Sequence, residues 1–285
     1  MRILIAGGSG VIGARLIPAL VAAGHDIAAT TRRPSTVAQL EQLGATGMVM
    51  DAFDAAGVAT VVTAAAPDLI IHELTDLTFY DRDANAQLRR KGTANLVAAA
   101  AGAGVERMMV QSIAFSYIPG DTPADENTPL LPGSAVAEME ALVARLPHAT
   151  MLRFGMLYGP DTWYDLGNRI FDEINTGSLP ATPAITSFVH IDDAVAATVD
   201  AIGWPDGAYN IVDDDPAPAT EWMPEYATRI GAPPPRREPL ADGAALGRAA
   251  SNTKAHAHGW TPAYPSWRDG FAGWVRGSGS ASRQS

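Results

Sequence analysis

Short apolar runs alternate with longer segments of helical periodicity from the first residues of the chain. RILIA at residues 2–6 precedes a helical pattern that begins near Val11, DIAATT precedes one that runs through Leu40, and GMVM precedes one over residues 54–65. DLIIH at residues 68–72 is the next apolar run. Short apolar runs bounded by turn residues are typical of buried strands, and a period of about 3.6 is typical of helices. The alternation therefore predicts repeated βαβ units.

The same rhythm continues to residue 155 and then changes. A helical pattern over residues 81–103 leads to the strand-like VERMMVQS, and another over residues 134–146 leads to ATMLRF. Parallel strands joined by right-handed helical crossovers predict an α/β fold, a Rossmann-type doubly wound parallel sheet. Beyond residue 155, proline, glycine and aromatic residues become more frequent. This change predicts a smaller, discontinuous C-terminal substrate lobe.

We expect three parts along the chain. The dinucleotide-binding domain takes residues 1–155 plus 188–212, the substrate-binding lobe takes 156–187 plus 213–276, and GSGSASRQS at 277–285 forms a disordered tail. Ligands of doubly wound sheets bind outside the carboxyl ends of the strands. Candidate site residues are therefore expected just after each strand.

Three glycines follow the first strand directly and open the first helix. They are Gly7, Gly10 and Gly13 in GGSGVIG. In dinucleotide-binding proteins the first supplies the tight turn, the second lets the backbone approach a pyrophosphate, and the third lets helix and strand pack closely. The helix N-terminus adds N–H groups and a positive dipole. We therefore predict a dinucleotide site with the turn residues Gly7, Ser9, Gly10, Val11, Ile12 and Gly13.

The end of the second strand bears on the choice of cofactor. An acid there binds the ribose 2′-hydroxyl of NADH, whereas an arginine binds the 2′-phosphate of NADPH. Asp26 stands at the start of this strand, at the wrong edge of the sheet, while Thr31, Arg32 and Arg33 close it. We predict NADPH as the cofactor, with NADH as the alternative. The competing interpretation is that one of the arginines is only a solvated surface charge.

The composition narrows the class of protein. The 285 residues carry 20 basic and 31 acidic side chains, a formal net charge of −11 that repels nucleic acid and anionic lipid. The absence of cysteine excludes thiolate catalysis and fits a reducing cytoplasm, and the histidines show no metal-ligand spacing. No apolar stretch is long enough to span a membrane. We expect a cytoplasmic enzyme with a small-molecule substrate and no metal, nucleic-acid or membrane partner; the oligomeric state is left open.

Seven motifs occur in order along nearly the whole chain. They are GxxGxxG at 7–13, Asp51 closing the third strand, KGTANL at 91–96, VERMMVQS at 105–112, LRFGMLYGP at 152–160, FVHIDDA at 188–194 and AYNIV at 208–212. Together they resemble the extended short-chain dehydrogenase/reductase superfamily, in its NAD-dependent epimerase/dehydratase branch. Seven ordered motifs are far more specific than the glycines alone.

This resemblance implies further cofactor contacts. Asp51 with Ala52 would hold the adenine, and Leu74 and Thr75 would line the nicotinamide ribose. We also expect Gln111, in VERMMVQS, and Phe154, in LRFGMLYGP, to contact the cofactor. His190 and Asp193 would be structural.

The catalytic pair of the family is missing from the positions where the motifs place it. The family uses a tyrosine with a lysine four residues later, whose ammonium lowers the phenol pKa from about 10. Matching its K-x-x-x-E helix to VAEME puts Val136 at the lysine and Pro132 at the tyrosine, and neither can titrate. The chain's two lysines, Lys91 and Lys254, have no tyrosine four residues before them. The resemblance therefore implies the fold and the cofactor but not the usual chemistry.

The segment VQSIAFSY at residues 110–117 carries the best remaining hydroxyls. We predict Ser112 and Tyr117, at the carboxyl end of the fifth strand, as catalytic groups that donate hydrogen bonds to a substrate carbonyl, although the spacing of the family puts Ile113 at the catalytic hydroxyl. The competing interpretation is that Ser112 ends a strand and Tyr117 packs a loop. His72, which ends the fourth strand, is a weaker candidate.

Aromatic residues near the LYGP turn bear on the substrate. Tyr158, Trp163 and Tyr164 suit a bulky, apolar or polyaromatic ligand, although aromatic residues also build cores. An alanine-rich, lysine-poor composition is typical of GC-rich genomes, where tailoring reductases of antibiotic pathways are common, and the chain is similar to aromatic-polyketide ketoreductases. We predict an NADPH-dependent ketoreductase that reduces a bulky ketone by hydride transfer. The alternatives are an epimerase or dehydratase that retains its nucleotide, and a non-catalytic NADP-binding regulator.

Overall fold

The computed structural model describes residues 1–75, 81–240 and 247–278, which divide into two compact units. Unit 1 takes Met1–Ser112, Leu130–Arg153 and Thr198–Ala208. Unit 2 takes Ile113–Pro129, Phe154–Ala197 and the chain from Tyr209 onward.

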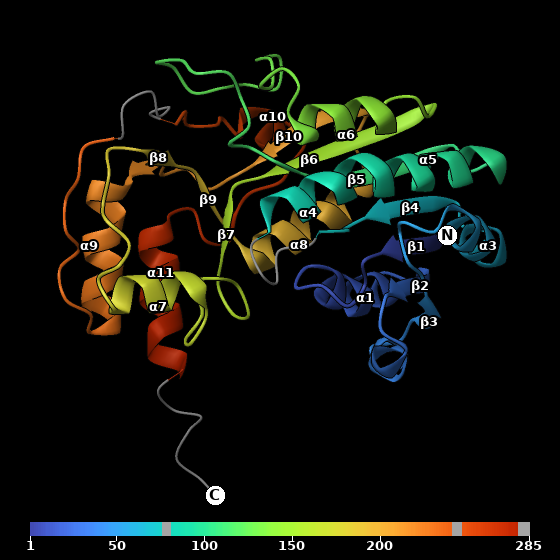
Figure 1. Ribbon diagram of the computed structural model, residues 1–285, viewed down its shortest axis with the longest axis horizontal. Coiled ribbons are helices and arrows are strands. Elements are labelled where there is room, and N and C mark those ends of the chain that lie inside the picture. Colours follow the sequence, from blue (N-terminus) through green and yellow to red (C-terminus); the bar gives the residue numbers. More distant parts are fainter. Residues whose placement is uncertain (76–80, 241–246, 279–285) are drawn as a thin grey trace, which may run out of the picture. The chain divides into compact units, whose positions relative to one another are not determined.

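A seven-stranded sheet organises unit 1. Its strands are β1 (Arg2–Ala6), β2 (Asp26–Thr31), β3 (Thr46–Val49), β4 (Leu69–His72), β5 (Arg107–Ile113), β6 (His148–Phe154) and β10 (Gly207–Ile211), which continues into unit 2. Their order is β10-β6-β5-β4-β1-β2-β3 (Figure 1). β1 pairs in parallel with β2 and β4, β2 with β3, and β4 with β5. The order reverses between β1 and β4, so the predicted Rossmann-type α/β fold is confirmed.

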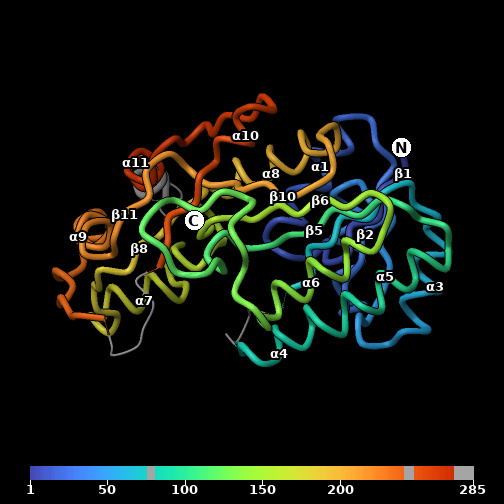
Figure 2. Tube along the Cα trace, turned by 90° about the horizontal axis from the view of Figure 1, so that it is seen from above, coloured from blue at the N-terminus to red at the C-terminus, as the bar shows by residue number. Residues whose placement is uncertain are grey.

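Helices cover both faces of this sheet. The helices and helical turns of unit 1 are α1 (Gly13–Ala22), η1 (Pro34–Thr36), α2 (Val37–Gln42), α3 (Ala55–Ala65), α4 (Arg82–Gln87), the π-helical η2 (Leu88–Gly92), α5 (Thr93–Gly102), α6 (Ala135–Val143) and η3 (Ala201–Gly203). Seen from above, α1 lies on one side of β1 and β2, and α3 and α5 lie on the other (Figure 2). Coverage on both faces explains why residues 3–6 of β1 and residues 69–71 of β4 form continuous apolar runs rather than alternating patterns.

Polar side chains fix the starts of several helices. The Asp54 carboxylate accepts a hydrogen bond from the Ala56 N–H at the start of α3, and Ser134 accepts one from Ala137 at the start of α6. Asp81 caps α4 in the same way. The helix predicted over residues 81–103 is continuous from Arg82 to Gly102, with the π-helical turn η2 between α4 and α5.

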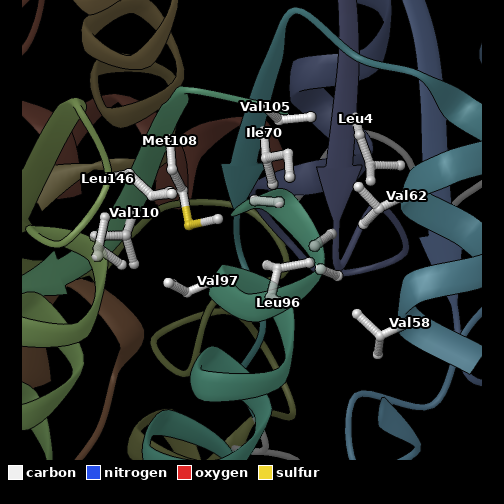
Figure 3. Close-up of a cluster of buried hydrophobic side chains, with 14 of the residues drawn as sticks. Leu4, Val58, Val62, Ile70, Leu96, Val97, Val105, Met108, Val110 and Leu146 are labelled. Carbon is white, nitrogen blue, oxygen red and sulfur yellow. The ribbon is translucent and has the colours of Figure 1, made fainter. Parts of the chain in front are cut away.

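Apolar side chains from the strands meet those of α3 and α5 in the core of unit 1 (Figure 3). Leu4, Ile70 and Met108 come from β1, β4 and β5, and Val62 and Leu96 come from the two helices. All are buried, and burying a side chain of this size stabilises a fold by about 1.5–3 kcal/mol. This cluster fixes the sheet whose carboxyl edge carries the candidate site.

Unit 2 contains two small sheets and several helices. Its elements are β7 (Met156–Tyr158), α7 (Arg169–Asn175), β8 (Ile185–Thr186), β9 (Phe188–His190), α8 (Ile191–Asp200, whose last residues belong to unit 1), β11 (Ala217–Pro218), α9 (Ala219–Ile230), α10 (Thr253–Ala257) and α11 (Trp267–Ser278). β7 pairs in parallel with β9, and β8 pairs antiparallel with β11. Asp193 accepts hydrogen bonds from the N–H groups of Ala263 and Tyr264, a structural contact within this unit.

The unit boundaries differ from the predicted domains. Residues 188–190 were expected in the dinucleotide-binding domain, but they form β9 and pair with β7 inside unit 2. Residues 113–129 also belong to unit 2. Of the predicted disordered tail, residues 277–278 lie in α11 and residues 279–285 lie outside the described part of the chain. Within the described residues, no helix combines the length and apolar character needed to cross a membrane.

Candidate functional site

The glycine turn after β1 leaves no room for a side chain at two of its positions. Gly7 has a φ of 98°, and a Cβ on it would lie 2.8 Å from the Glu73 carbonyl oxygen. A Cβ on Gly13 would lie 2.5 Å from the Gly7 carbonyl oxygen, so both positions exclude a side chain. α1 starts at Gly13, and its first turn carries no acidic side chain that would oppose an anion at the helix N-terminus. The residues of this turn fit a dinucleotide.

A group of hydroxyls ties the glycine turn to the end of β2. The Thr30 hydroxyl accepts a hydrogen bond from the Gly7 N–H at 3.1 Å. The Thr31 hydroxyl oxygen lies 3.3 Å from the Ser9 hydroxyl, which donates to it, and 3.2 Å from the Arg33 N–H. These bonds hold the backbone of Arg33 beside the turn.

The end of β2 presents cations and no acid. Arg32 and Arg33 are exposed directly after Thr31. Asp26 pairs in register with Arg2 at the amino end of the strands, the edge away from the glycine turn. The charged side chains that directly follow β2 in the described chain are therefore the two guanidinium groups.

The end of β3 reaches the same edge. The Met50 N–H donates to the Thr31 carbonyl at 2.9 Å, which brings Asp51 and Ala52 beside the end of β2. One Asp51 carboxylate oxygen accepts from the Phe53 N–H, and the Asn95 side chain donates to the Ala52 carbonyl. Asp51 is exposed and Ala52 is buried. The turn, β2 and β3 thus bring most of the predicted adenine-side residues together.

The other predicted cofactor residues lie after or at the ends of further strands. Leu74 and Thr75 follow β4 and are half-buried, as is Gln111 near the end of β5. Phe154 ends β6, is fully buried and belongs to unit 2. Their contacts with a cofactor stay predictions.

The Ser112 hydroxyl is hydrogen-bonded within a buried ionic network. Its hydroxyl donates to Glu140 Oε1 at 2.6 Å. Arg153 donates to the same carboxylate through Nε at 2.9 Å and Nη2 at 2.7 Å. All three side chains are buried. Because Glu140 can only accept, the single hydroxyl proton of Ser112 is already used, and this corrects the prediction that it donates to a substrate carbonyl.

Tyr117 is committed in the same way. Its hydroxyl lies 2.6 Å from Asn210 Oδ1, and it is 5% exposed. The Asn210 amide nitrogen donates to the carbonyls of Ala124 and Ser251, which identifies Oδ1 as the acceptor and Tyr117 as the donor. The structure thus agrees with the interpretation that Tyr117 packs a loop. Because its hydroxyl proton is donated to Asn210, it is not available for the predicted hydrogen bond to a substrate carbonyl.

Removing either hydroxyl should therefore affect folding more than chemistry. For Ser112→Ala and Tyr117→Phe we expect a reduction rate close to wild type, well short of the about 100-fold loss that removal of a general acid causes. The free energy of unfolding should fall by about 1.5–3 kcal/mol for Ser112→Ala, whose partner is charged. Single-turnover kinetics and urea unfolding measure the two effects, with Ser116→Ala as the matched control. An about 100-fold slower reduction by a folded variant would restore a catalytic role.

The aromatic residues predicted to bind substrate have different surroundings. Tyr158 and Tyr164 are buried in an aromatic cluster of unit 2 that includes Phe188 and Phe271, with ring centroids 5.0–6.0 Å apart. Such packing is the competing interpretation of these residues. Trp163 is half-buried, and the Arg169 guanidinium lies 5.8 Å from its ring. Of the three, only Trp163 retains exposed surface for a ligand.

His72 is buried and neutral. The Leu74 N–H donates to its Nδ1 at 3.2 Å, so Nε2 carries the proton and donates to the Thr93 hydroxyl at 2.8 Å. Burial, with the nearby charge of Arg89, lowers the pKa of His72 to about 4. Both ring nitrogens are used in the fold, so His72 serves to hold β4 against α5.

The positions matched to the family's catalytic pair carry no titratable group. Val136 is buried in α6 and Pro132 is exposed just before it. The Lys91 ammonium lies 5.8 Å from the Phe53 ring, and the Lys254 ammonium lies 4.1 Å from the Tyr209 ring. Both lysines thus rest against aromatic faces.

Sequence reasoning missed Glu73. This carboxyl directly follows β4 beside the glycine turn, is 5% exposed, and burial raises its pKa to about 8. The available signal was an acidic residue directly after LIIH, a strand that is apolar except for its last residue, His72.

The fold and the glycine turn define a Rossmann-type dinucleotide-binding enzyme. The sequence model of the NAD dependent epimerase/dehydratase family matches residues 3–211. The chain belongs to this family, as the sequence motifs predicted.

Relatives and solved structures narrow the class. A protein from a Streptomyces species, named 3-diazoavenalumate denitrifying reductase, is 41% identical over 305 residues that cover 95% of this chain and 99% of that protein. The UDP-glucose 4-epimerase of Thermus thermophilus in complex with NAD matches with a TM-score of 0.81 at 23% identity, covering 99% of this chain and 100% of that one. The dTDP-glucose 4,6-dehydratase of Streptomyces venezuelae, with NAD and TYD bound, matches with a TM-score of 0.80 at 21% identity, over 97% and 96% of the two chains. The chain is an oxidoreductase that uses a nicotinamide dinucleotide.

Proposed function

We propose that this reductase delivers hydride to an electrophile that needs no proton from the protein, and that its substrate is an aromatic diazo acid reduced with loss of nitrogen. The similarity to a denitrifying reductase at 41% identity carries the proposal, because that protein is named for a diazo substrate. The site supports it, since Val136 and Pro132 stand where the family's lysine and tyrosine are expected.

The chemistry of a diazo group fits such a site. A bound nicotinamide supplies a hydride. An aryl diazonium ion, Ar–N₂⁺, that gains a hydride and loses N₂ becomes Ar–H, so atoms and charge balance without a proton. The residues of the chain then need only bind and orient the reactants, and orientation alone can supply about 7–11 kcal/mol of the barrier.

A ketone reductase is the second candidate. Reduction of a ketone leaves an alkoxide that must be protonated, and a positioned acid contributes about 3–5 kcal/mol to that step. Loss of this contribution slows the reaction without preventing it. The half-buried ring of Trp163 favours a bulky, flat ketone of the polyketide type.

The two candidates are separated by one comparison of substrates. Purified protein and reduced cofactor are mixed either with aryl diazonium carboxylates or with polycyclic ketones, and the absorbance of the reduced nicotinamide is followed together with gas release. We expect cofactor oxidation with release of N₂ from the diazonium acids. Oxidation by the ketones alone would favour the second candidate, and inertness toward both panels would overturn the proposal.

The cofactor in this proposal is NADPH. Its support is the pair of exposed arginines after β2, with NADH as the alternative. We expect Arg32→Ala with Arg33→Ala to weaken NADPH binding by about tenfold or more, because a charged hydrogen bond to phosphate contributes about 1.5–3 kcal/mol. NADH binding should change little.

Calorimetric titration of both cofactors measures this preference. Arg145→Ala, an exposed arginine after α6, is the matched control and should change neither affinity. Equal weakening of NADPH and NADH binding would contradict the phosphate contact.

A further inference from the structure

Glu73 is a buried carboxyl that no described residue neutralises through its Oε2 atom. Its side chain is 5% exposed, and its Oε2 atom has no hydrogen-bond partner among the described residues. Burial alone raises its pKa to about 8, so the group is protonated at neutral pH. A buried polar atom left unsatisfied costs about 1–3 kcal/mol, and a ligand that pairs with it removes this cost.

The register of the sheet places Glu73 beside the glycine turn. Ala6 is level with His72 in the β1–β4 pair, and the Glu73 N–H donates to the Ala6 carbonyl at 2.8 Å, so the pairing continues through Glu73. A Cβ on Gly7 would lie 2.8 Å from the Glu73 carbonyl oxygen. Glu73 therefore lies at the strand end next to the pyrophosphate turn.

The alternation of side chains along a strand places Glu73 on the sheet face opposite to that of His72. His72 points to α5, where its ring bonds Thr93, and successive side chains of a strand point to opposite faces. Glu73 is therefore directed to the other face, which carries α1 (Figure 2).

The described surroundings of Glu73 bring no charge of either sign to its carboxyl. The glycine turn at residues 7–13 and the end of β5 at residues 110–113 contain no titratable side chain. On its own strand, His72 is neutral and bound to Thr93, and the charge of Arg89 acts on that ring. Burial is the cause that acts on Glu73. A charged group of a ligand that approaches the Glu73 carboxyl would therefore meet no competing charge from these described residues.

The topology indicates which part of a bound cofactor would come to this strand. With the pyrophosphate at the turn after β1 and the adenine half over β2 and β3, the nicotinamide half would extend over β4 and β5. This ring is neutral when reduced and carries one positive charge when oxidised. We propose that Glu73 distinguishes the two oxidation states of the nicotinamide, because its ionised form pairs with the cationic oxidised ring and its protonated form does not.

This proposal rests on the reductase function, which requires the reduced cofactor to bind and the oxidised cofactor to leave. At neutral pH a protonated Glu73 gives the cationic ring no counter-charge, which favours release of the oxidised form. Above pH about 8 the carboxylate pairs with the ring and retains it. Both forms carry the same pyrophosphate, so a comparison of the two isolates the charge of the ring.

The test measures the dissociation constants of NADP⁺ and NADPH below and above pH 8. In the wild-type protein we expect the dissociation constant of NADP⁺, divided by that of NADPH, to fall by about tenfold as pH rises. A tenfold change corresponds to a difference of about one unit between the pKa values of Glu73 beside the two forms of the ring. Calorimetry in buffers of different ionisation enthalpy should show that NADP⁺ releases more protons than NADPH. In Glu73→Gln the ratio should not change with pH, and in the control Glu106→Gln, at the opposite end of β5, it should follow wild type.

Stability provides an independent check that Glu73 titrates in the folded protein. The unfolded carboxyl ionises near its ordinary pKa of 4.5, while the folded group stays protonated to about 8. Wild type should therefore lose stability relative to Glu73→Gln as pH rises between these values. A wild-type ratio that does not vary with pH, or the same variation in Glu73→Gln, would overturn the role of Glu73 while leaving the reductase function intact. Failure of wild type to bind either form would overturn both.

Discussion

Arg153→Met is expected to lower the free energy of unfolding by about 3–5 kcal/mol. The substitution removes the Nε and Nη2 hydrogen bonds to the buried Glu140 carboxylate and leaves it the Ser112 hydroxyl as a donor among the described residues. A buried charge without its partner is among the most costly single defects in a fold. Urea unfolding monitored by circular dichroism measures the loss.

Two further variants make this result specific. Arg145→Met removes an exposed arginine of the same unit and should change stability by no more than about 0.5 kcal/mol. Arg153→Met combined with Glu140→Leu removes both charges and should be more stable than Arg153→Met alone. If Arg153→Met behaves like the exposed control, the buried pair does not stabilise unit 1.

Gly13→Ala is expected to weaken binding of the dinucleotide by about tenfold to 100-fold, because an added methyl group in a filled space costs about 1–3 kcal/mol. The new Cβ would lie 2.5 Å from the Gly7 carbonyl oxygen and 2.8 Å from the Gly8 Cα, so the turn must move. The protein should still fold, since the strain is confined to the turn. Titration with reduced cofactor measures the change.

Gly102→Ala is the matched control for this effect. Gly102 ends α5, and a Cβ there meets nothing within 4 Å. Its cofactor affinity should equal that of wild type. Unchanged affinity in Gly13→Ala would mean that the turn does not hold the pyrophosphate.

Local patterns were sufficient to predict the sheet and the glycine turn. Apolar runs such as RILIA fix which segments become strands, and the spacing of Gly7, Gly10 and Gly13 places the turn directly after the first of them. The position of Asp26 at the wrong edge also followed from its place at the start of a strand. Each of these features depends on neighbours in the sequence.

Partners that are distant in the sequence could not be predicted. The acceptor of Ser112 is Glu140 on α6, 28 residues away, and that of Tyr117 is Asn210, 93 residues away. Nothing local distinguishes a hydroxyl bonded in this way from one open to a substrate. The assignment of β9 to unit 2 has the same cause, because a buried apolar strand does not reveal which strand it pairs with.

The aromatic residues show a second limit of the sequence. Tyr158 and Tyr164 build the core of unit 2, while Trp163 between them in the chain is half-buried. A large aromatic side chain is equally suited to a core and to a ligand site, so composition does not separate the two.

The central claim is that the chain reduces its substrate by hydride transfer without a proton relay. The most direct measurement is single-turnover oxidation of the bound reduced cofactor by an aryl diazonium carboxylate, in H₂O and in D₂O, with the released N₂ quantified. We expect one N₂ for each cofactor oxidised and equal rates in the two solvents. A rate several-fold slower in D₂O, or loss of N₂ without oxidation of the cofactor, would contradict it.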